Sequence, residues 1–324
     1  MRVLVTGGAG YIGSHTVRGL LKKGHEVVIL DNLSRGHAES VPPNVLFEKA
    51  DLLDKEGLGR VFSNHVFDAV IHFAAFAYVG ESVENPGLYY ENNVVGSYNL
   101  INAVKENGIN KFVFSSTCSI YGNPVIIPIS EIQQSAPINP YARTKLMIEN
   151  ILGDYDESHG LKYAALRYFN AAGCSDDGSI GESHEPEPHL IPLVLFAALG
   201  KRKSIKIYGD DYDTKDGTCI RDYIHVNDLA EAHVLALEYL DGGNPSTVIN
   251  LGTGDGYSVK EIVNAAREIT GIDIKSEIVD RRAGDPAVLV ADNSKAKKVL
   301  GWKPEYGLNR IIETAWNWHK NQKY

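Results

Sequence analysis

Short apolar runs alternate with amphipathic segments through the first half of the chain. Buried strands are predicted at Arg2–Thr6, Glu26–Leu30, Val45–Lys49, Ala69–His72, Lys111–Ser115 and Leu161–Arg167. Apolar residues at helical spacing predict helices at Ile12–Lys23, Leu88–Lys105 and Tyr141–Ser158. Strands that alternate with helices are typical of a parallel sheet covered on both faces. The pattern therefore predicts a doubly wound parallel sheet of the α/β class.

The pattern changes after about Gly173. An acidic stretch with proline and glycine, residues 175–189, leads into shorter mixed elements. Helical spacing returns at Asn227–Leu240, Val259–Thr270 and Leu308–Lys320. We predict a first domain over residues 1–173 and a smaller mixed α/β carboxy-terminal lobe over residues 174–324. The boundary is soft, because later segments can return to the first sheet.

A glycine-rich turn follows the first predicted strand. Gly7, Gly10 and Gly13 lie in the run GGAGYIG, between that strand and a helix. They fit a dinucleotide turn, which needs a tight reversal, close approach to pyrophosphate and close helix–strand packing, and the helix start offers N–H groups to phosphate. The next strand ends at Asp31, where a carboxylate accepts from a ribose 2′-hydroxyl and repels a 2′-phosphate. A structural turn without a ligand is the alternative, but this order of elements favours a Rossmann domain that binds NAD rather than NADP.

Tyr141 and Lys145 lie four residues apart and project from one face of a predicted helix. Asn139 can cap that helix, and Pro140 can occupy its first position. A phenol ionises near pH ~10, so a base at neutral pH needs its pKa lowered by roughly three units, or ~4 kcal/mol. A nearby ammonium favours the phenolate, and an oxidised nicotinamide ring adds a second positive charge. Most such pairs elsewhere are a half-buried tyrosine beside a solvated lysine, which is the structural alternative.

The predicted strand that begins at Lys111 continues into the hydroxyl-bearing residues Ser115, Ser116 and Thr117. Open parallel sheets bind ligands beyond the carboxyl ends of their strands, where Thr117 is expected. A hydroxyl, a phenol and a lysine at that edge form a proton-transfer set. We therefore predict Thr117, Tyr141 and Lys145 as the catalytic residues.

Composition narrows the functional classes. The 324 residues are 44% hydrophobic and carry a formal net charge of −9 at pH 7, which gives no support to binding of nucleic acid or of an anionic membrane. No apolar run reaches the about 18 residues of a membrane span. Cys118, Cys174 and Cys219 are odd in number and widely spaced, as fits a reducing compartment. Because the first residues enter a strand directly, we expect no signal peptide and a cytoplasmic location.

One polar cluster in the acidic stretch contains residue types that bind metals. It consists of His184, Glu185, Glu187 and His189. Its spacing matches no recognised metal motif, and it lies in a predicted loop. From the sequence we therefore predict no metal site.

Longer motifs are spread over nearly the whole chain. They are residues 1–15, 70–75 (VIHFAA), 79–83 (VGESV), 92–94 (NNV), 167–170 (RYFN), 221–226 (RDYIHV), 250–252 (NLG) and 281–285 (RRAGD). Together they resemble the extended short-chain dehydrogenase/reductase family, and within it the members that invert C4 of a UDP-hexose. The resemblance implies reversible epimerisation between UDP-glucose and UDP-galactose through a transient 4-keto sugar. It also implies a tightly bound NAD that is regenerated in each cycle.

The resemblance implies roles for individual residues. Tyr141 would take the proton of the sugar 4-hydroxyl, Thr117 would hydrogen-bond that oxygen, and Lys145 would hold the nicotinamide ribose and lower the tyrosine pKa. The implied cofactor contacts are these three residues and Gly7, Gly10, Tyr11, Ile12, Gly13, Asp31, Asn32, Asp51, Leu52, Phe73, Ala74, Ala75, Asn92 and Phe169. The implied UDP-sugar contacts are Asn170, His189, Lys206, Ile207, Tyr208, Arg221, Arg282, Asp285 and Leu289.

The arginine assignments agree with the charge of a UDP pyrophosphate, because guanidinium forks match phosphate oxygens. The structural alternative for Arg221 and Arg282 is an ion pair with Asp222 or Asp285.

Two positions depart from the pattern of some relatives. His189 stands where they carry a substrate-binding asparagine, although a histidine can still donate to phosphate. Leu289 stands where an aromatic side chain lines their sugar pocket. A smaller aliphatic residue there could make room for an N-acetyl group, so UDP-N-acetylhexosamines are an alternative substrate class, as are UDP-hexuronates.

Other functions remain as alternatives. A sugar-nucleotide dehydratase or decarboxylase shares the hydride step, but such relatives add an acid just after the strand-end threonine, where this chain has Cys118 and Ser119. A non-catalytic dinucleotide sensor would be expected to have lost Tyr141 or Lys145. An ordinary dehydrogenase would release NADH in proportion to substrate.

The resemblance also implies an assembly. Relatives usually pair through two long helices of the cofactor domain, which form a four-helix bundle. Here these helices would be Leu88–Lys105 and Tyr141–Ser158. A homodimer is therefore expected, although the sequence alone does not exclude a monomer.

Overall fold

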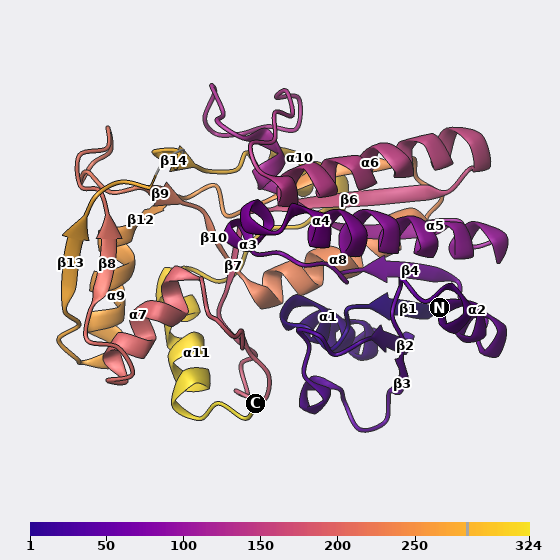
Figure 1. Ribbon diagram of the computed structural model, residues 1–324, viewed down its shortest axis with the longest axis horizontal. Helices are drawn as coiled ribbons and strands as arrows, with labels where there is room; N and C mark the ends of the chain where they lie inside the picture. Colours follow the sequence, from indigo (N-terminus) through magenta and orange to yellow (C-terminus); the bar gives the residue numbers. More distant parts are fainter. Residues whose placement is uncertain (283–284) are drawn as a thin grey trace.

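The computed structural model describes residues 1–282 and 285–324, and Figure 1 shows a larger and a smaller lobe. The larger lobe contains a parallel sheet of seven strands in the order β11-β6-β5-β4-β1-β2-β3. These strands are β1 (Arg2–Thr6), β2 (Glu26–Asp31), β3 (Leu46–Lys49), β4 (Ala69–His72), β5 (Lys111–Thr117), β6 (Lys162–Tyr168) and β11 (Thr247–Leu251). The order reverses between β1 and β4, which is the switch point of a doubly wound sheet. The predicted fold class is confirmed.

Helices cover both faces of this sheet. One face is covered by α1 (Tyr11–Lys22), α8 (Val226–Asp241) and α10 (Ser294–Leu300), and the other by α2 (Lys55–Asn64), α5 (Gly96–Glu106) and α6 (Pro140–His159). Along β1, Val3 and Val5 belong to the first core and Leu4 to the second. Successive side chains of a strand point to opposite faces, so a strand buried on both sides is apolar at every position.

The smaller lobe has a core of its own, at the left of Figure 1. Its helices are α7 (Leu190–Ala198), α9 (Val259–Thr270) and α11 (Leu308–Lys320), and its parallel strand pair is β8 (Ile205–Tyr208) with β13 (Ser276–Val279). Two further small sheets pair β7 (Asn170–Ala172) with β10 (Tyr223–His225), and β9 (Ile220–Arg221) with β12 (Tyr257–Ser258) and β14 (Val288–Leu289).

The chain passes between the lobes more than once. After β7 it enters the smaller lobe, and it then returns through α8 and β11, which pairs with β6 at one edge of the large sheet. Segments from the second half of the sequence therefore help to build the larger lobe. Among the described residues, no helix combines the length and the apolar character that crossing a bilayer requires.

The segment predicted as one helix at Leu88–Lys105 is interrupted. It consists of α4 (Pro86–Tyr89), a π-helical segment η2 (Tyr90–Val95) and α5, and it follows the short helix α3 (Val79–Glu84). Within η2, the Asn93 side chain accepts from the Phe76 N–H and donates to the Phe76 carbonyl and to Thr144, which ties this segment to its neighbours. The 3₁₀ turns η1 (Ala38–Ser40) and η3 (Cys118–Tyr121) complete the helical elements. Most other predicted boundaries differ from the structure by one or two residues.

Candidate active site

A cleft of about 1410 Å³ opens at the carboxyl edge of the large sheet. Residues at or after the ends of β1, β2, β4, β5 and β6 line it, together with residues from the second half of the chain such as His189 and Arg282. Pockets for a single small ligand usually measure about 300–1,000 Å³. The cleft therefore has room for two small molecules side by side.

The glycine turn at the start of α1 leaves space for a ligand. Gly7 has a φ of +71°, and a Cβ on it would lie 2.5 Å from the Ala74 nitrogen. A Cβ on Gly13 would lie 2.2 Å from the Gly7 carbonyl oxygen. Gly10 is the N-cap of α1, and no side chain within the described residues caps the helix. Free N–H groups and the positive end of the helix dipole therefore face an approach that suits phosphate.

Asp31 is fixed at the end of β2 beside this turn. Its Oδ2 accepts from the Ala9 N–H at 3.1 Å and its Oδ1 from the Leu33 N–H at 2.8 Å. Burial raises the pKa of this carboxyl from its ordinary value, and the two N–H bonds act in the opposite direction. Next to it, Asn32 donates to Asp51 at 2.8 Å. These polar groups all line the cleft, where they can meet ribose hydroxyls.

The three predicted catalytic side chains meet in the same cleft. Helix α6 starts as predicted, with Pro140 in its first turn and the Asn139 side chain accepting from the Ala142 N–H at 2.9 Å. This start places Tyr141 and Lys145 beside the end of β5, where Thr117 lies. All three side chains are buried and line the cleft.

The electrostatics of the pair differ from the expectation that the lysine lowers the tyrosine pKa. Lys145 Nζ donates to the Ser115 carbonyl at 2.7 Å and lies 6.0 Å from the centroid of the Tyr141 ring. Burial lowers the pKa of Lys145 to about 7. Burial also raises the pKa of Tyr141 well above its ordinary value, while the adjacent Thr117 hydroxyl lowers it. In the protein chain itself, burial is therefore the largest influence on the Tyr141 pKa.

The predicted contacts divide into those that line the cleft and those that do not. All the cofactor candidates named from the sequence line it. The substrate candidates that line it are Asn170, His189, Arg282 and Asp285. Within the described residues, the substrate candidates outside its lining are Lys206, Ile207, Tyr208, Arg221 and Leu289. Residues 283 and 284 of the RRAGD motif lie outside the described part of the chain.

Several of the substrate candidates outside the lining contact residues that form it. Arg221 makes an ion pair with Asp285, which is the arrangement considered as the structural alternative. The Arg282 guanidinium lies 3.9 Å from the centroid of the Tyr208 ring. Leu289 packs in a small core with Phe169. The carboxy-terminal wall is thus a network in which one layer of residues positions the next.

Sequence reasoning missed a second group of cleft residues. Arg35 forms an ion pair with Glu81 at 2.6 Å, and its guanidinium lies 4.9 Å from the centroid of the Tyr78 ring. All three line the cleft. The motif VGESV contains Glu81, but it gave no indication of a partner 46 residues earlier.

Comparisons with known proteins agree with this geometry. The sequence model described as "NAD dependent epimerase/dehydratase family" matches residues 3–252. A UDP-glucose 4-epimerase from Halalkalibacterium halodurans is 53% identical over 325 aligned positions, which cover 100% of this chain and 97% of the relative.

Solved structures are similar over the whole chain as well. One is a UDP-glucose 4-epimerase from Brucella ovis in complex with NAD, with a TM-score of 0.95, 49% identity and coverage of 97% of each chain. Another is a UDP-Glc/GlcNAc 4-epimerase from Campylobacter jejuni, with a TM-score of 0.88, 46% identity and coverage of 98% of this chain and 99% of that one.

Proposed function

This chain belongs to the NAD dependent epimerase/dehydratase family, and we propose that it is an enzyme that reversibly epimerises C4 of UDP-glucose and UDP-galactose. One observation carries the proposal. A hydroxyl, a phenol and a lysine, from Thr117, Tyr141 and Lys145, line the same cleft as a glycine turn suited to a dinucleotide. A dinucleotide bound at the glycine turn and the three side chains can therefore act on the same sugar carbon.

The amino-terminal wall fits NAD. Gly7 and Gly13 allow a pyrophosphate to approach the start of α1, and Asp31 suits a free 2′-hydroxyl better than a 2′-phosphate. When bound, NAD supplies the acceptor and then the donor of a hydride, and its oxidised ring carries a positive charge. Tight retention of the cofactor is part of the proposal, because an epimerase restores it in every turnover.

The catalytic residues manage the proton of the sugar 4-hydroxyl. We infer that Tyr141 Oη accepts this proton as C4 becomes a carbonyl, and returns it after the 4-keto sugar has turned over in the cleft. Thr117 Oγ1 hydrogen-bonds the same sugar oxygen, and Lys145 Nζ binds the nicotinamide ribose. A positive charge beside the buried phenol lowers its pKa strongly, since burial reduces screening. Because the pKa of Tyr141 is raised in the chain alone, we infer that Tyr141 acts as a base only when the charged cofactor ring lies beside it.

The carboxy-terminal wall anchors the UDP group while the sugar turns. Arg282 and Asn170 line the cleft, and Arg221 lies behind it through its ion pair with Asp285. We infer that a pyrophosphate bound by Arg282 stays in place during the reaction. His189 contributes through its Nε2, since its Nδ1 is held by carboxylates. Residues 1–173 thus serve mainly as the NAD-binding domain and residues 174–324 as the UDP-sugar lobe, with β11 and α8 as later segments of the first.

The direct test needs no added cofactor. The purified protein is incubated with UDP-galactose, and the appearance of UDP-glucose is followed by NMR together with absorbance at 340 nm. We expect conversion to a mixture without growth of absorbance. A stoichiometric rise at 340 nm would identify a dehydrogenase instead. No conversion even after addition of NAD would exclude the epimerase.

A second substrate class has a specific observation in its favour. One similar structure is named for action on both UDP-Glc and UDP-GlcNAc, and Leu289, although outside the lining of the cleft, packs against the small core that holds the cleft residue Phe169. We propose that UDP-N-acetylglucosamine is also accepted. NMR under the conditions that convert UDP-glucose tests this, and an unchanged spectrum would exclude the broader specificity.

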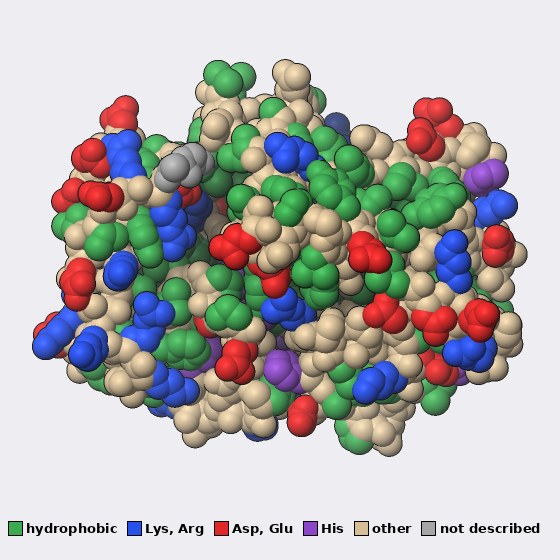
Figure 2. Space-filling view, viewed as in Figure 1, with side chains coloured by type: hydrophobic (Ala, Val, Ile, Leu, Met, Phe, Trp, Pro, Cys, Tyr) green, Lys and Arg blue, Asp and Glu red, His purple; other side chains and the backbone are tan. Residues whose placement is uncertain are grey.

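We also propose that the protein is a cytoplasmic homodimer that pairs through α5 and α6. Figure 2 shows hydrophobic side chains gathered over these helices. The exposed apolar residues of η2, α5 and α6 include Val95, Tyr98 and Met147. Light scattering should give a dimer for the protein and a monomer for Tyr98→Glu. The control is Val66→Glu, at an exposed apolar position before β4, which should remain dimeric.

A further inference from the structure

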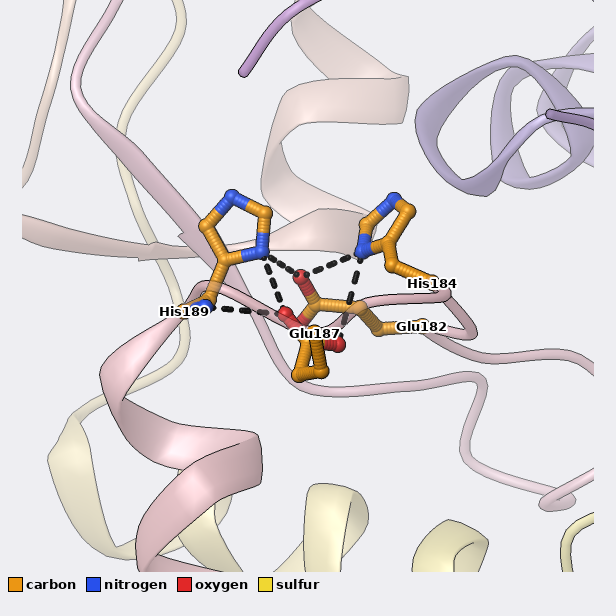
Figure 3. Close-up of side chains that lie close together, drawn as sticks. All are labelled: Glu182, His184, Glu187 and His189. Atoms are coloured by element: carbon orange, nitrogen blue, oxygen red, sulfur yellow. Dashed lines mark hydrogen bonds and ion pairs between the residues drawn. The ribbon is translucent and has the colours of Figure 1, made fainter. Parts of the chain in front are cut away.

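Four side chains from the loop between β7 and α7 converge beside the cleft (Figure 3). They are Glu182, His184, Glu187 and His189, and one possible ligand atom from each lies within 4.8 Å of the others. His189 Nδ1 is 2.8 Å from a Glu182 oxygen and 2.7 Å from a Glu187 oxygen. His184 Nδ1 is 3.3 Å and 3.4 Å from oxygens of the same two residues. Two imidazole nitrogens and two carboxylates therefore surround one point.

Two atoms of this cluster are buried without a hydrogen bond. The side chain of Glu187 is only 4% exposed, yet its Oε2 has no hydrogen-bond partner among the described residues. The same holds for His184 Nδ1. Both atoms point toward the space enclosed by the cluster (Figure 3). The two atoms face each other at 3.4 Å as an ion pair without a hydrogen bond, so both remain available to a cation that binds at the centre.

The loop that carries the cluster is held in place from several sides. The Trp318 indole N–H donates to the Glu182 carbonyl at 2.7 Å, and the Ser183 hydroxyl donates to the Tyr324 carbonyl at 3.1 Å. The rings of Tyr11 and Tyr78 pack edge-on against His184. The donor set is thus largely preorganised, as a metal site requires.

We propose that Glu182, His184, Glu187 and His189 bind one divalent transition-metal ion of the zinc class, through two Nδ1 atoms and one carboxylate oxygen from each glutamate. Two imidazoles with two carboxylates match the ligand preferences of zinc, whereas calcium and magnesium prefer oxygen alone. This differs from the expectation from sequence. The spacing Glu-x-His-x-x-Glu-x-His matches no standard motif, and only the folded loop brings the four side chains together.

The alternative to a bound metal ion is protonation of both imidazole rings. Without metal, the two carboxylates pair with both rings and so favour their protonated form. Metal ligation needs both Nδ1 atoms free of protons, and so metal binding must release protons. The two states can therefore be distinguished by proton counting.

The site has a structural consequence for the cleft. Glu182, His184 and His189 line it, and Tyr11, which contacts His184, follows the glycine turn directly. A bound cation would clamp this loop and neutralise two carboxylates at the edge of a cleft that receives phosphates. We infer a structural and electrostatic role for the ion, with no part in hydride or proton transfer.

The test uses the purified protein with its bound cofactor, treated with a chelator and then dialysed. Zinc sulfate is titrated by calorimetry at pH 7.5 in two buffers of different ionisation enthalpy. We expect one ion per chain, release of up to two protons and a rise in the thermal unfolding midpoint. Cobalt(II) in place of zinc should give the visible bands of a four-coordinate ion.

Substitutions separate this site from adventitious binding. Glu187→Gln and His189→Asn should weaken zinc binding by more than the about 10–100-fold that loss of an outer-shell partner costs. The matched control is His65→Asn, which breaks another histidine–glutamate pair (His65 Nε2 to Glu48 Oε1, 2.7 Å) and should bind zinc normally. His189 is partly exposed, so that variant tests the site even if Glu187→Gln fails to fold.

Two results would overturn the proposal. One is binding of much less than one zinc per chain, and the other is full affinity in both cluster variants. Either result would identify the cluster as a protonated ion-pair network. Because stoichiometry, proton release and the cobalt spectrum do not depend on turnover, this failure is distinguishable from failure of the proposed epimerase reaction.

Discussion

The two walls of the cleft are built in different ways. The amino-terminal wall takes its key features from a short stretch, since Gly7, Gly13 and Asp31 all lie within the first two strands and their connection. The carboxy-terminal wall brings together Asn170 and Arg282, which are far apart in the sequence. The first wall is set by local backbone geometry, and the second by long-range packing. The predictions below test how far this difference reaches.

The largest expected effect is acid unfolding through four buried histidines. Burial lowers the pKa of His72 and His225 to about 3, and of His15 and His233 to about 4. In the unfolded chain a histidine binds a proton near pH ~6.5. Below that pH the unfolded state therefore holds more protons, and the free energy of unfolding decreases as the pH is lowered. Each histidine lowers the free energy of unfolding by ~1.4 kcal/mol per pH unit, until the pH reaches its pKa in the folded state. By about pH 5 their sum approaches the whole stability of a typical protein.

Titration of the histidines of the carboxy-terminal wall has the opposite effect on the pH dependence of stability. The raised pKa values of His184 and His189 mean that, in the absence of metal, the folded state holds more protons above about pH 6.5. Their contribution is complete below that pH and is lost as pH rises through about 9 to 10. Denaturant unfolding between pH 4.5 and 10, with a chelator present, should therefore show loss of stability at both ends.

One substitution tests whether a buried histidine causes the loss of stability at low pH. His233→Leu removes a buried histidine packed against Phe73 and should reduce the acid slope by about one proton. His159→Leu, at the exposed end of α6, is the control and should leave the slope unchanged. Equal slopes in both variants would contradict the assignment.

The sequence predicted the local features of the first wall because they follow from residue type and spacing. Glycine is required where a Cβ would meet the backbone at 2.2 Å, as at Gly13, and Asn139 with Pro140 sets the start of α6. It did not predict the Arg35–Glu81 pair or the π-helical segment η2. These depend on contacts between distant segments. The raised pKa of Tyr141 was also missed, since the depth of burial is a property of the whole fold.

The second prediction removes the phenol of the catalytic set. Tyr141→Phe should lower turnover by about 10²–10⁴-fold, the range that general acid–base catalysis contributes. Because Tyr141 is buried without filling the glycine turn, the variant should still contain NAD after acid precipitation. NMR of UDP-galactose conversion measures the loss. Near-normal turnover would remove the phenol from the mechanism.

The third prediction tests the backbone geometry of the first wall. In Gly13→Ala the new Cβ would lie 2.2 Å from the Gly7 carbonyl oxygen, so the turn must shift, at about 1–3 kcal/mol of stability and with loss of bound NAD. Gly59→Ala is the control, since a Cβ on this glycine of α2 meets no described atom within 4 Å and alanine favours a helix by about 1 kcal/mol. Thermal unfolding and NAD content should therefore separate the two alanines. Equal NAD content in both would show that the turn adapts.

The smallest effect is expected from a substitution in the second wall, where several residues contribute to substrate binding. Arg282→Ala removes a guanidinium that lines the cleft and stacks on Tyr208. Loss of one charge-assisted hydrogen bond of about 1.5 kcal/mol predicts an increase in KM for UDP-galactose of roughly tenfold, with kcat and NAD content little changed. The neighbouring Arg281 provides the control, since it pairs with the exposed Asp211 and does not line the cleft.

The two arginine variants decide whether the second wall binds through a specific fork or through general positive charge. If Arg281→Ala and Arg282→Ala raise KM equally, the contribution of Arg282 is only its charge, and it should fade with added salt. If Arg282→Ala alone raises KM and does so at high salt as well, the guanidinium contacts the substrate directly. The second result is the expected one, because stacking on Tyr208 fixes the orientation of the Arg282 fork before substrate arrives.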